Sequence, residues 1–198
     1  MEPSRGYTDE QREQIIQDYY ERSSMRGVQR VFGVSRPTLS KWLKKDESNL
    51  PLKETLLPAQ PTDELELDEM WSFVSKKSEK RWLWTALCRR TRQILAHVIG
   101  DRGVKTCRKL WKLLPDEYKV CCSYSDFWEA YQKVFPKETQ RSVGKETGQT
   151  AHMERWNNTL RQSNARYVRK ILAFSKNDFY HALVTRLYVI RYNLSLVH

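Results

Sequence analysis

The feature that most constrains the fold is a set of three strand-like runs that follow one another across very short gaps. The runs are rich in β-branched and aromatic residues and cover residues 65–74, 81–88 and 92–100. Between them lie only residues 75–80, which contain the basic turn KKSEK, and the tripeptide RRT. Connections this short cannot carry a crossover helix, so the three runs are predicted to form an antiparallel meander.

The elements after the meander indicate the class of fold. A helix over residues 103–114 is expected to end before Pro115, and a buried strand to follow over 118–124. Further elements are expected as a strand near 139–143 and helices over 150–167 and 176–192. Strand, strand, strand, helix, strand is the opening order of the RNase H fold. Residues 63–198 are therefore predicted to form an RNase H-like α/β domain with a mixed sheet.

The N-terminal segment is predicted to form a small all-α domain. Its three helices are expected over residues 8–24, 26–32 and 35–45. Thr8 and Gln11 make a capping-box pattern at the start of the first helix. The sequence ESNLPLKETLLPAQP then carries three prolines and no sustained period, which is typical of a linker. We therefore expect a small helical domain over 1–46, a linker over 47–62 and the larger domain over 63–198.

The run RGVQRVFGVSRPTLSKWLKK has the pattern of a helix-turn-helix. Gly33 supplies the turn, and Leu39, Trp42 and Leu43 would form the buried side of the last helix. In this motif the last helix lies in the major groove of DNA and reads base edges with its N-terminal residues. The candidate DNA contacts are Arg36, Thr38, Ser40, Lys41, Lys44 and Lys45. A purely structural three-helix bundle is the alternative.

The charge of the chain favours an anionic partner. The formal net charge is +11, and residues 63–198 hold 25 of the 35 Lys and Arg but 15 of the 24 Asp and Glu. Between residues 155 and 176 there are six basic residues and no acidic one; they are Arg155, Arg161, Arg166, Arg169, Lys170 and Lys176. Such a stretch fits a track for DNA phosphates. A solvated basic helix would look the same.

Other features exclude several classes of protein. No run approaches the roughly 18 apolar residues of a membrane span, and the N-terminus lacks an apolar signal-peptide core. We therefore expect a cytoplasmic protein. The four cysteines show no C-x-x-C spacing, so they are interpreted as small buried hydrophobes rather than as metal ligands or disulfides.

Three carboxylates are candidates for a shared metal-binding site, since a metal ion is one of the few partners that suits several carboxylates together. Asp68 interrupts the first strand, Asp126 directly follows the strand YKVCCSY, and Glu154 lies in the first turn of a helix. Ligands of open α/β sheets bind outside the carboxyl ends of strands, where Asp126 would lie. Each residue also has an ordinary interpretation, as part of a solvated acidic run, as an N-cap or as a complement to a helix dipole. The pattern by itself leaves both interpretations open.

A family resemblance favours the first interpretation. The segments DEMWSFVSKKSEKRWLWTALCRRTRQILAHVIGDR, SDFWEAY, VGKETGQTAHMERWNNTLRQ and RKILAFSK resemble transposases of the IS-one family of insertion sequences. The resemblance implies a DDE triad of Asp68, Asp126 and Glu154 that holds two Mg²⁺ ions, which Mn²⁺ can replace, for DNA strand cleavage and transfer. Arg161, seven residues after Glu154, is similar to a residue that grips a phosphate near the scissile bond.

The resemblance also implies partners. These are double-stranded DNA, as terminal inverted repeats and as target, and further copies of the chain in a dimer or higher oligomer. It places the protein in the bacterial cytoplasm in association with the nucleoid. A DNA-binding regulator with an inactive nuclease-like domain is one alternative function, and a generic RNase H-like nuclease is another. His152 and His181 are interpreted as structural, since no metal-ligand spacing links them.

Overall fold

The computed structural model of the protein describes residues 6–21, 24–168 and 174–197. The chain divides into two compact units, the first ending at Asn49 and the second beginning at Leu50. No helix among the described residues combines the length and the apolar character that a membrane crossing needs. All four cysteines are free thiols.

The first unit consists of three helices. They are α1 (Asp9–Tyr20), α2 (Met25–Phe32) and α3 (Arg36–Asn49). The capping box at the start of α1 is confirmed, because the Thr8 side chain accepts from the Gln11 backbone and the Gln11 side chain accepts from the Thr8 backbone. Gly33 ends α2 with a φ of 71°, a left-handed conformation that glycine adopts without strain. The helix α3 continues past the expected end near Lys45, because no helix breaker precedes Pro51.

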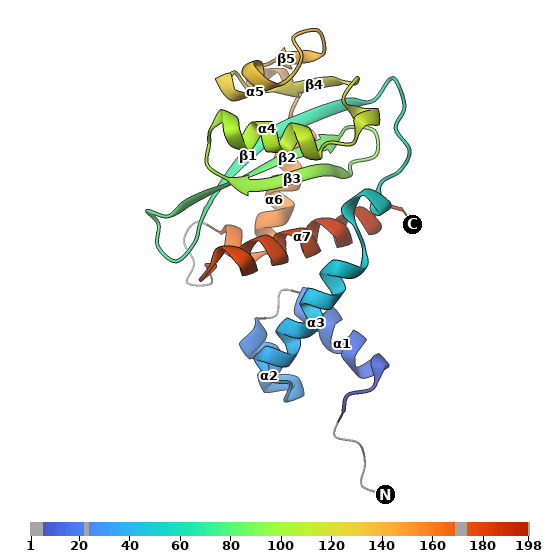
Figure 1. The fold of residues 1–198 in the computed structure, drawn as a ribbon, viewed down its shortest axis with the longest axis vertical. Coiled ribbons are helices and arrows are strands. Elements are labelled where there is room, and N and C mark those ends of the chain that lie inside the picture. Colours follow the sequence, from blue (N-terminus) through green and yellow to red (C-terminus); the bar gives the residue numbers. More distant parts are fainter. Residues whose placement is uncertain (1–5, 22–23, 169–173, 198) are drawn as a thin grey trace, which may run out of the picture. The chain divides into compact units, whose positions relative to one another are not determined.

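The second unit is built on a mixed five-stranded sheet (Figure 1). Its strands are β1 (Glu64–Phe73), β2 (Lys80–Cys88), β3 (Ile94–Gly100), β4 (Cys122–Ser125) and β5 (Gln140–Ser142). Their order is β3-β2-β1-β4-β5. The first three strands pair antiparallel, which confirms the predicted meander, whereas β4 and β5 run parallel to β1.

Helices cover both faces of this sheet and bury two separate clusters of apolar side chains. One face packs against α4 (Val104–Leu113) and α5 (Glu129–Val134) through a cluster that includes Leu67 and Trp84. The other packs against α6 (Ala151–Ser163) and α7 (Asp178–Leu194) through a cluster that includes Met70, Met153 and Trp156. The unit is an α/β fold compatible with the RNase H-like arrangement.

Two predicted elements are shorter than expected. The strand predicted over 118–124 begins only at Cys122, because residues 116–118 form a 3₁₀ turn, η2 (Asp116–Tyr118), after Pro115. The helix predicted over 150–167 ends at Ser163. Asn164 then starts a 3₁₀ turn, η4 (Ala165–Tyr167), by accepting from the Arg166 backbone.

The proline-rich segment after α3 is packed within the second unit instead of running free as a linker. It contains a 3₁₀ turn, η1 (Leu52–Thr55), and Thr55 is buried. The Gln93 amide bonds both the Thr55 carbonyl, at 2.7 Å, and the Leu57 backbone nitrogen, at 2.8 Å. The Tyr118 hydroxyl donates to the Leu57 carbonyl at 2.9 Å. These bonds satisfy backbone groups that the prolines leave without a regular partner.

Candidate active site

Asp68 lies in the middle of β1, on the face that α6 covers. Side chains of a strand alternate between its two faces, so Glu64, Glu66 and Asp68 share one face while Glu69 lies on the other. The Asn157 amide of α6 donates to Asp68 Oδ2 at 2.6 Å. Burial, followed by the negative charges of Glu69 and Asp126, raises the pKa of Asp68 to about 7. Asp68 is thus a buried carboxylate that receives a hydrogen bond but, among the described residues, pairs with no cation.

Asp126 directly follows β4 and comes close to Asp68. The parallel register pairs Glu66 with Tyr124, and continuing it by two residues sets Asp126 beside Asp68, on neighbouring strands about 4.8 Å apart. The negative charge of Asp126 raises the pKa of both Asp68 and Glu69. Asp126 Oδ1 also accepts from the Trp128 backbone at 3.0 Å. The carboxylate therefore shapes the turn into α5 as well as facing Asp68.

Glu69 has a structural role on the opposite face of β1. It is buried, and its carboxylate accepts from Arg102 at 2.6 and 2.9 Å and from the Tyr131 hydroxyl at 2.8 Å. The Arg102 guanidinium lies over the rings of Trp82 and Trp128, 4.7 and 4.3 Å from their centroids. This packing fixes the turn that carries Asp126.

Glu154 lies on α6 beside the acidic pair without joining it. Its side chain is exposed, one helical turn before Asn157, which bonds Asp68. Among the described residues no three His, Cys, Asp or Glu side chains come together as a ready metal site. The structure thus brings Asp68 and Asp126 together and places Glu154 on the adjacent helix, with its carboxylate directed to solvent.

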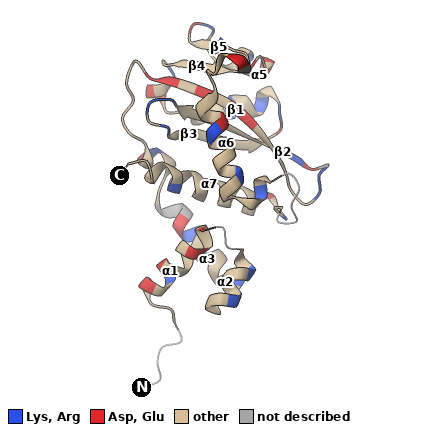
Figure 2. Cartoon of the chain, turned by 180° about the vertical axis from the view of Figure 1, so that it is seen from behind, with Lys and Arg blue, Asp and Glu red and all other residues tan. Residues whose placement is uncertain are grey.

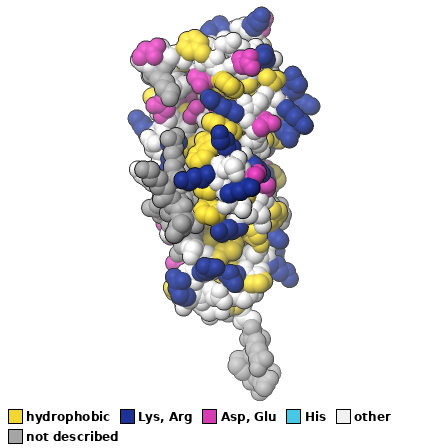
Figure 3. Space-filling model, turned by 90° about the vertical axis from the view of Figure 1, so that its left-hand side faces the viewer, with side chains coloured by type: hydrophobic (Ala, Val, Ile, Leu, Met, Phe, Trp, Pro, Cys, Tyr) yellow, Lys and Arg dark blue, Asp and Glu magenta, His cyan; other side chains and the backbone are white. Residues whose placement is uncertain are grey.

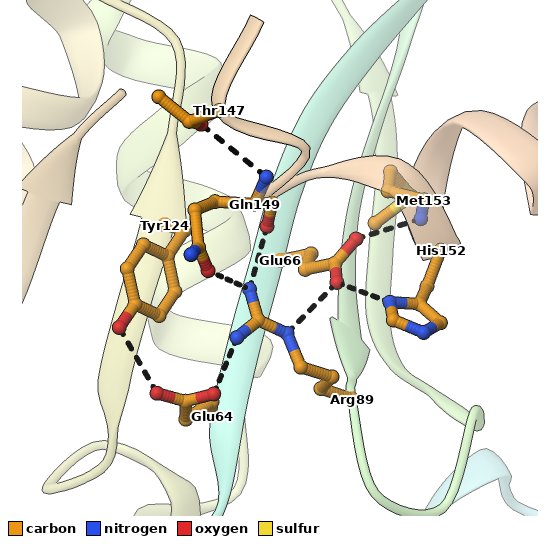
Figure 4. Close-up of polar contacts among 8 residues, drawn as sticks. All are labelled: Glu64, Glu66, Arg89, Tyr124, Thr147, Gln149, His152 and Met153. Atoms are coloured by element: carbon orange, nitrogen blue, oxygen red, sulfur yellow. Dashed lines mark hydrogen bonds and ion pairs between the residues drawn. The ribbon is translucent and has the colours of Figure 1, made fainter. Parts of the chain in front are cut away.

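A buried network fixes the start of α6 against β1 (Figure 4). Glu66 is fully buried, and its carboxylate accepts from the Met153 backbone at 2.8 Å and lies 2.7 Å from His152 Nδ1. Arg89 donates to Glu66 at 3.0 Å and also bonds Glu64. Glu66 belongs to β1, whereas His152 and Met153 belong to the first turn of α6. These bonds therefore hold α6 at a fixed position along β1.

The same arginine extends the network to the loop before α6. Arg89 Nη2 donates to the backbone carbonyl of Gln149 at 2.6 Å and to its side chain at 2.9 Å. The Tyr124 hydroxyl donates to Glu64 at 2.9 Å. Sequence reasoning missed Glu66 and Arg89. A signal was present for Glu66, since it stands two residues from Asp68 and therefore on the same face of the strand.

One oxygen in the site lacks a partner. Among the described residues, the buried Asn157 Oδ1 accepts no hydrogen bond, although buried polar atoms are nearly always paired. It belongs to the side chain whose nitrogen bonds Asp68. Two neighbouring carboxylates and an unpaired amide oxygen are hard oxygen donors with excess negative charge, which is the chemistry that suits a small divalent cation.

The remaining predicted residues of the second unit occupy different environments. Arg155 is exposed, whereas Arg161 is half-buried and donates to Asn158 Oδ1 at 3.5 Å. Arg166 is also half-buried and donates to Ser175 Oγ at 3.3 Å. Arg169 and Lys170 lie outside the described residues.

The two histidines interpreted as structural lie in hydrogen-bonded positions. His152 contacts Glu66, as described above. His181 is fully buried between Ser72, 3.0 Å from Nε2, and Ser175, 2.8 Å from Nδ1. Burial lowers the pKa of His181 to about 4, so its imidazole is neutral at pH 7.

In the first unit, most of the predicted DNA contacts are accessible. The side chains of Arg36, Lys41, Lys44 and Lys45 are exposed, and Thr38 is half-buried with its backbone nitrogen bonded to Ser35 Oγ. Ser40 is only 7% exposed. The prediction that Ser40 is available to DNA is therefore wrong, because Ser40 lies next to the buried Leu39 on the inner side of α3.

Comparisons with known proteins show the family of the chain. Residues 64–193, more than half of the chain, match the family model described as IS1 transposase. The chain is 39% identical over 119 residues to the Insertion element iso-IS1n protein InsB of Shigella dysenteriae, covering 60% of this chain and 88% of the relative. It is 32% identical over 157 residues to the Insertion element IS1 2 protein InsB of Escherichia coli (strain K12), covering 74% and 90%. The chain therefore belongs to the IS1 transposase family.

Proposed function

We propose that the chain is a DDE transposase that binds the terminal inverted repeats of an insertion sequence, nicks them and joins their 3′ ends to target DNA. The observation that supports this most is the pairing of Asp68 with Asp126 at the carboxyl end of β4, under the helix that carries Glu154. Membership of the family supports the transposase role, and the carboxylates are the groups proposed to carry out strand cleavage and joining.

Asp68, Asp126 and Glu154 are proposed to hold two Mg²⁺ ions, or Mn²⁺ in their place. When bound, the ions lower the pKa of an attacking water or 3′-hydroxyl and stabilise the leaving oxygen. Glu154 reaches this position by turning its exposed side chain toward Asn157, which lies on the same face of α6. Its final position is thus set when the ligand binds.

The other residues of the site orient the carboxylates and the DNA. Asn157 holds Asp68 through its amide, and Glu66 holds the first turn of α6, so that Glu154 stays within reach of the acidic pair. Arg161 is two turns after Glu154 and is proposed to bind a phosphate near the scissile bond, with Arg155 on the same track. Arg166, Arg169 and Lys170 are proposed as the continuation of this track.

The first unit is proposed to recognise the ends as a helix-turn-helix domain. In this proposal α3 enters the major groove, and its exposed residues Arg36, Lys41, Lys44 and Lys45 contact bases and phosphates. Two ends must be joined in one reaction while each chain supplies one site, so the active form is proposed to be a dimer or a higher oligomer. Light scattering of the protein on paired ends tests this.

A second candidate function is a DNA-binding regulator without nuclease activity. It is favoured by one observation, the outward direction of Glu154. The two functions differ in a single measurable property, which is cleavage that depends on a divalent metal.

The test is to incubate the full chain with DNA carrying the inverted repeats that flank its gene, in Mg²⁺, and to map nicks. Asp68→Asn, Asp126→Asn and Glu154→Gln should each abolish nicking while end binding persists. The exposed acids Asp116 and Glu138 offer matched controls as Asp116→Asn and Glu138→Gln, which should nick like the wild type. End binding without any nicking by the wild type would favour the regulator.

A further inference from the structure

The β1–β2 hairpin is a rigid basic arm at one end of the second unit. Its turn is closed by bonds from the Val74 backbone to the Glu79 carbonyl at 3.1 Å and from the Glu79 backbone to the Lys76 carbonyl at 2.9 Å. Ser75 adopts a φ of 65°, which is uncommon for a residue with a Cβ. An unconstrained loop would relax such a conformation, so the turn is held in one shape by its surroundings.

Contacts with the segment before α7 brace this arm. Val74 forms a parallel bridge with Ser175, and the Phe73 and Phe174 rings lie 5.2 Å apart. Arg81 makes two bonds to Asp178, of 2.7 and 3.1 Å. This bidentate geometry is the stronger form of an arginine–carboxylate pair. The hairpin therefore keeps its position relative to α7.

The arm presents several cations at its surface. The side chains of Lys76, Lys77, Lys80 and Lys176 are exposed. The acids nearby are already engaged, since Glu79 pairs with Lys76 and Arg81, and Asp178 with Arg81. Within the described part of the chain, Lys77 and Lys80 have no ion-pair partner. Fixed, unpaired lysines on a braced support suit an anionic ligand.

The arm lies in line with the candidate active site. One face of β1 makes contacts along its length. At Glu66 and Asp68 the partners are Met153 and Asn157 of α6. Further along, the partner of Ser72 is His181 of α7, and the partner of Val74 is Ser175, just before α7. Lys and Arg occur along α6 and at the hairpin (Figure 2), and Lys and Arg side chains are spread over the face of the molecule that Figure 3 shows. The hairpin lies at the end of this line of contacts, with Lys77 in its turn and Lys80 beside Phe73 at the start of β2.

From these observations we infer that the hairpin lysines bind the phosphates of the DNA duplex that flanks the cleavage position. The inference rests on the proposed function. Val74 is six residues beyond Asp68, which is ~20 Å along a strand at ~3.3 Å per residue. At ~3.4 Å per base pair, the lysines would meet the backbone ~6–8 base pairs from the scissile phosphate. A phosphate contact of this kind positions the duplex without reading its sequence.

The test compares two double variants that remove the same charge. Lys77→Gln/Lys80→Gln removes it from the arm, and Lys109→Gln/Lys112→Gln removes it from the exposed side of α4. Affinity of the full chain for a 40-base-pair duplex is measured by fluorescence anisotropy over a range of salt concentrations, in Ca²⁺. Each lost phosphate contact lowers the slope of log affinity against log salt by ~0.9.

The arm variant is expected to lose ~1.8 in slope, which corresponds to roughly 60-fold weaker binding at 0.1 M salt. The α4 variant should keep the wild-type slope. Equal losses in both variants, or no loss in the arm variant, would overturn the inference. Because this assay needs no cleavage, the arm can bind DNA even if the proposed chemistry fails. Where nicks are mapped, shortening the duplex to fewer than six base pairs beyond the nick should remove the difference between the arm variant and the wild type.

Discussion

Asp68→Asn is expected to make the protein more stable while it removes the proposed activity. Folding raises the pKa of Asp68 from its ordinary value of 3.8 to about 7. The folded state therefore binds a proton more tightly than the unfolded state, and wild-type stability falls as pH rises from about 4 to 7. The full shift of about three pKa values corresponds to about 4 kcal/mol at pH 8. Asparagine avoids this loss and still accepts the hydrogen bond from Asn157.

The assay is urea unfolding of the wild type and of Asp68→Asn at pH 5 and pH 8, both in EDTA. Other titrating groups are common to both proteins, so they cancel in the difference. The stability advantage of the variant should grow by about 2–3 kcal/mol between the two pH values. Added Mg²⁺ should stabilise the wild type and leave Asp68→Asn unchanged, because a ligand stabilises only the state that binds it. A difference that stays constant with pH would show that the Asp68 charge is compensated in the fold, contrary to our reasoning.

Three further predictions concern other parts of the molecule. Glu66→Gln should destabilise the second unit by about 3 kcal/mol, since it leaves Arg89 beside an uncharged group in a buried network; unchanged urea unfolding would contradict this. Arg36→Ala should weaken end binding by about 1–3 kcal/mol in a gel-shift titration, whereas Ser40→Ala should not alter discrimination between end and random DNA, and a reversed result would reassign the recognition face. His181 has a folded pKa of about 4 against an ordinary 6.5, so its contribution to stability is complete above pH 6.5 and is lost as pH falls toward 4. That loss is ~3 kcal/mol, and His181→Asn should make the melting temperature less dependent on pH over this range.

The sequence predicted much of the sheet because its strands are marked by local features. Short gaps gave the antiparallel meander, and the position of Asp126 after a strand predicted a carboxylate at a sheet edge. The boundaries of β4 and α6 were less accurate. Pro115 and Asn164 start 3₁₀ turns, and only the tertiary structure decides whether such a turn or a longer regular element forms.

The parts of the site that the sequence could not predict depend on contacts between distant residues. Arg89 is 60 residues from Gln149 in the chain, and Asn157 is 89 residues from Asp68. No local period links such pairs. The packing of residues 50–62 depends likewise on Gln93, which bonds backbone groups of a segment whose prolines are typical of a free linker.

The distribution of arginines along β1 has a consequence for copies of the gene that no longer need to be active. Glu64 and Glu66 pair with Arg89, and Glu69 pairs with Arg102, whereas in the described structure Asp68 has no such cation. Selection for folding alone would then conserve the paired glutamates but would not conserve Asp68. Decaying copies of the gene should accordingly lose Asp68 early, through substitutions that slow their turnover, while Glu66 and Glu69 persist until the reading frame itself is lost.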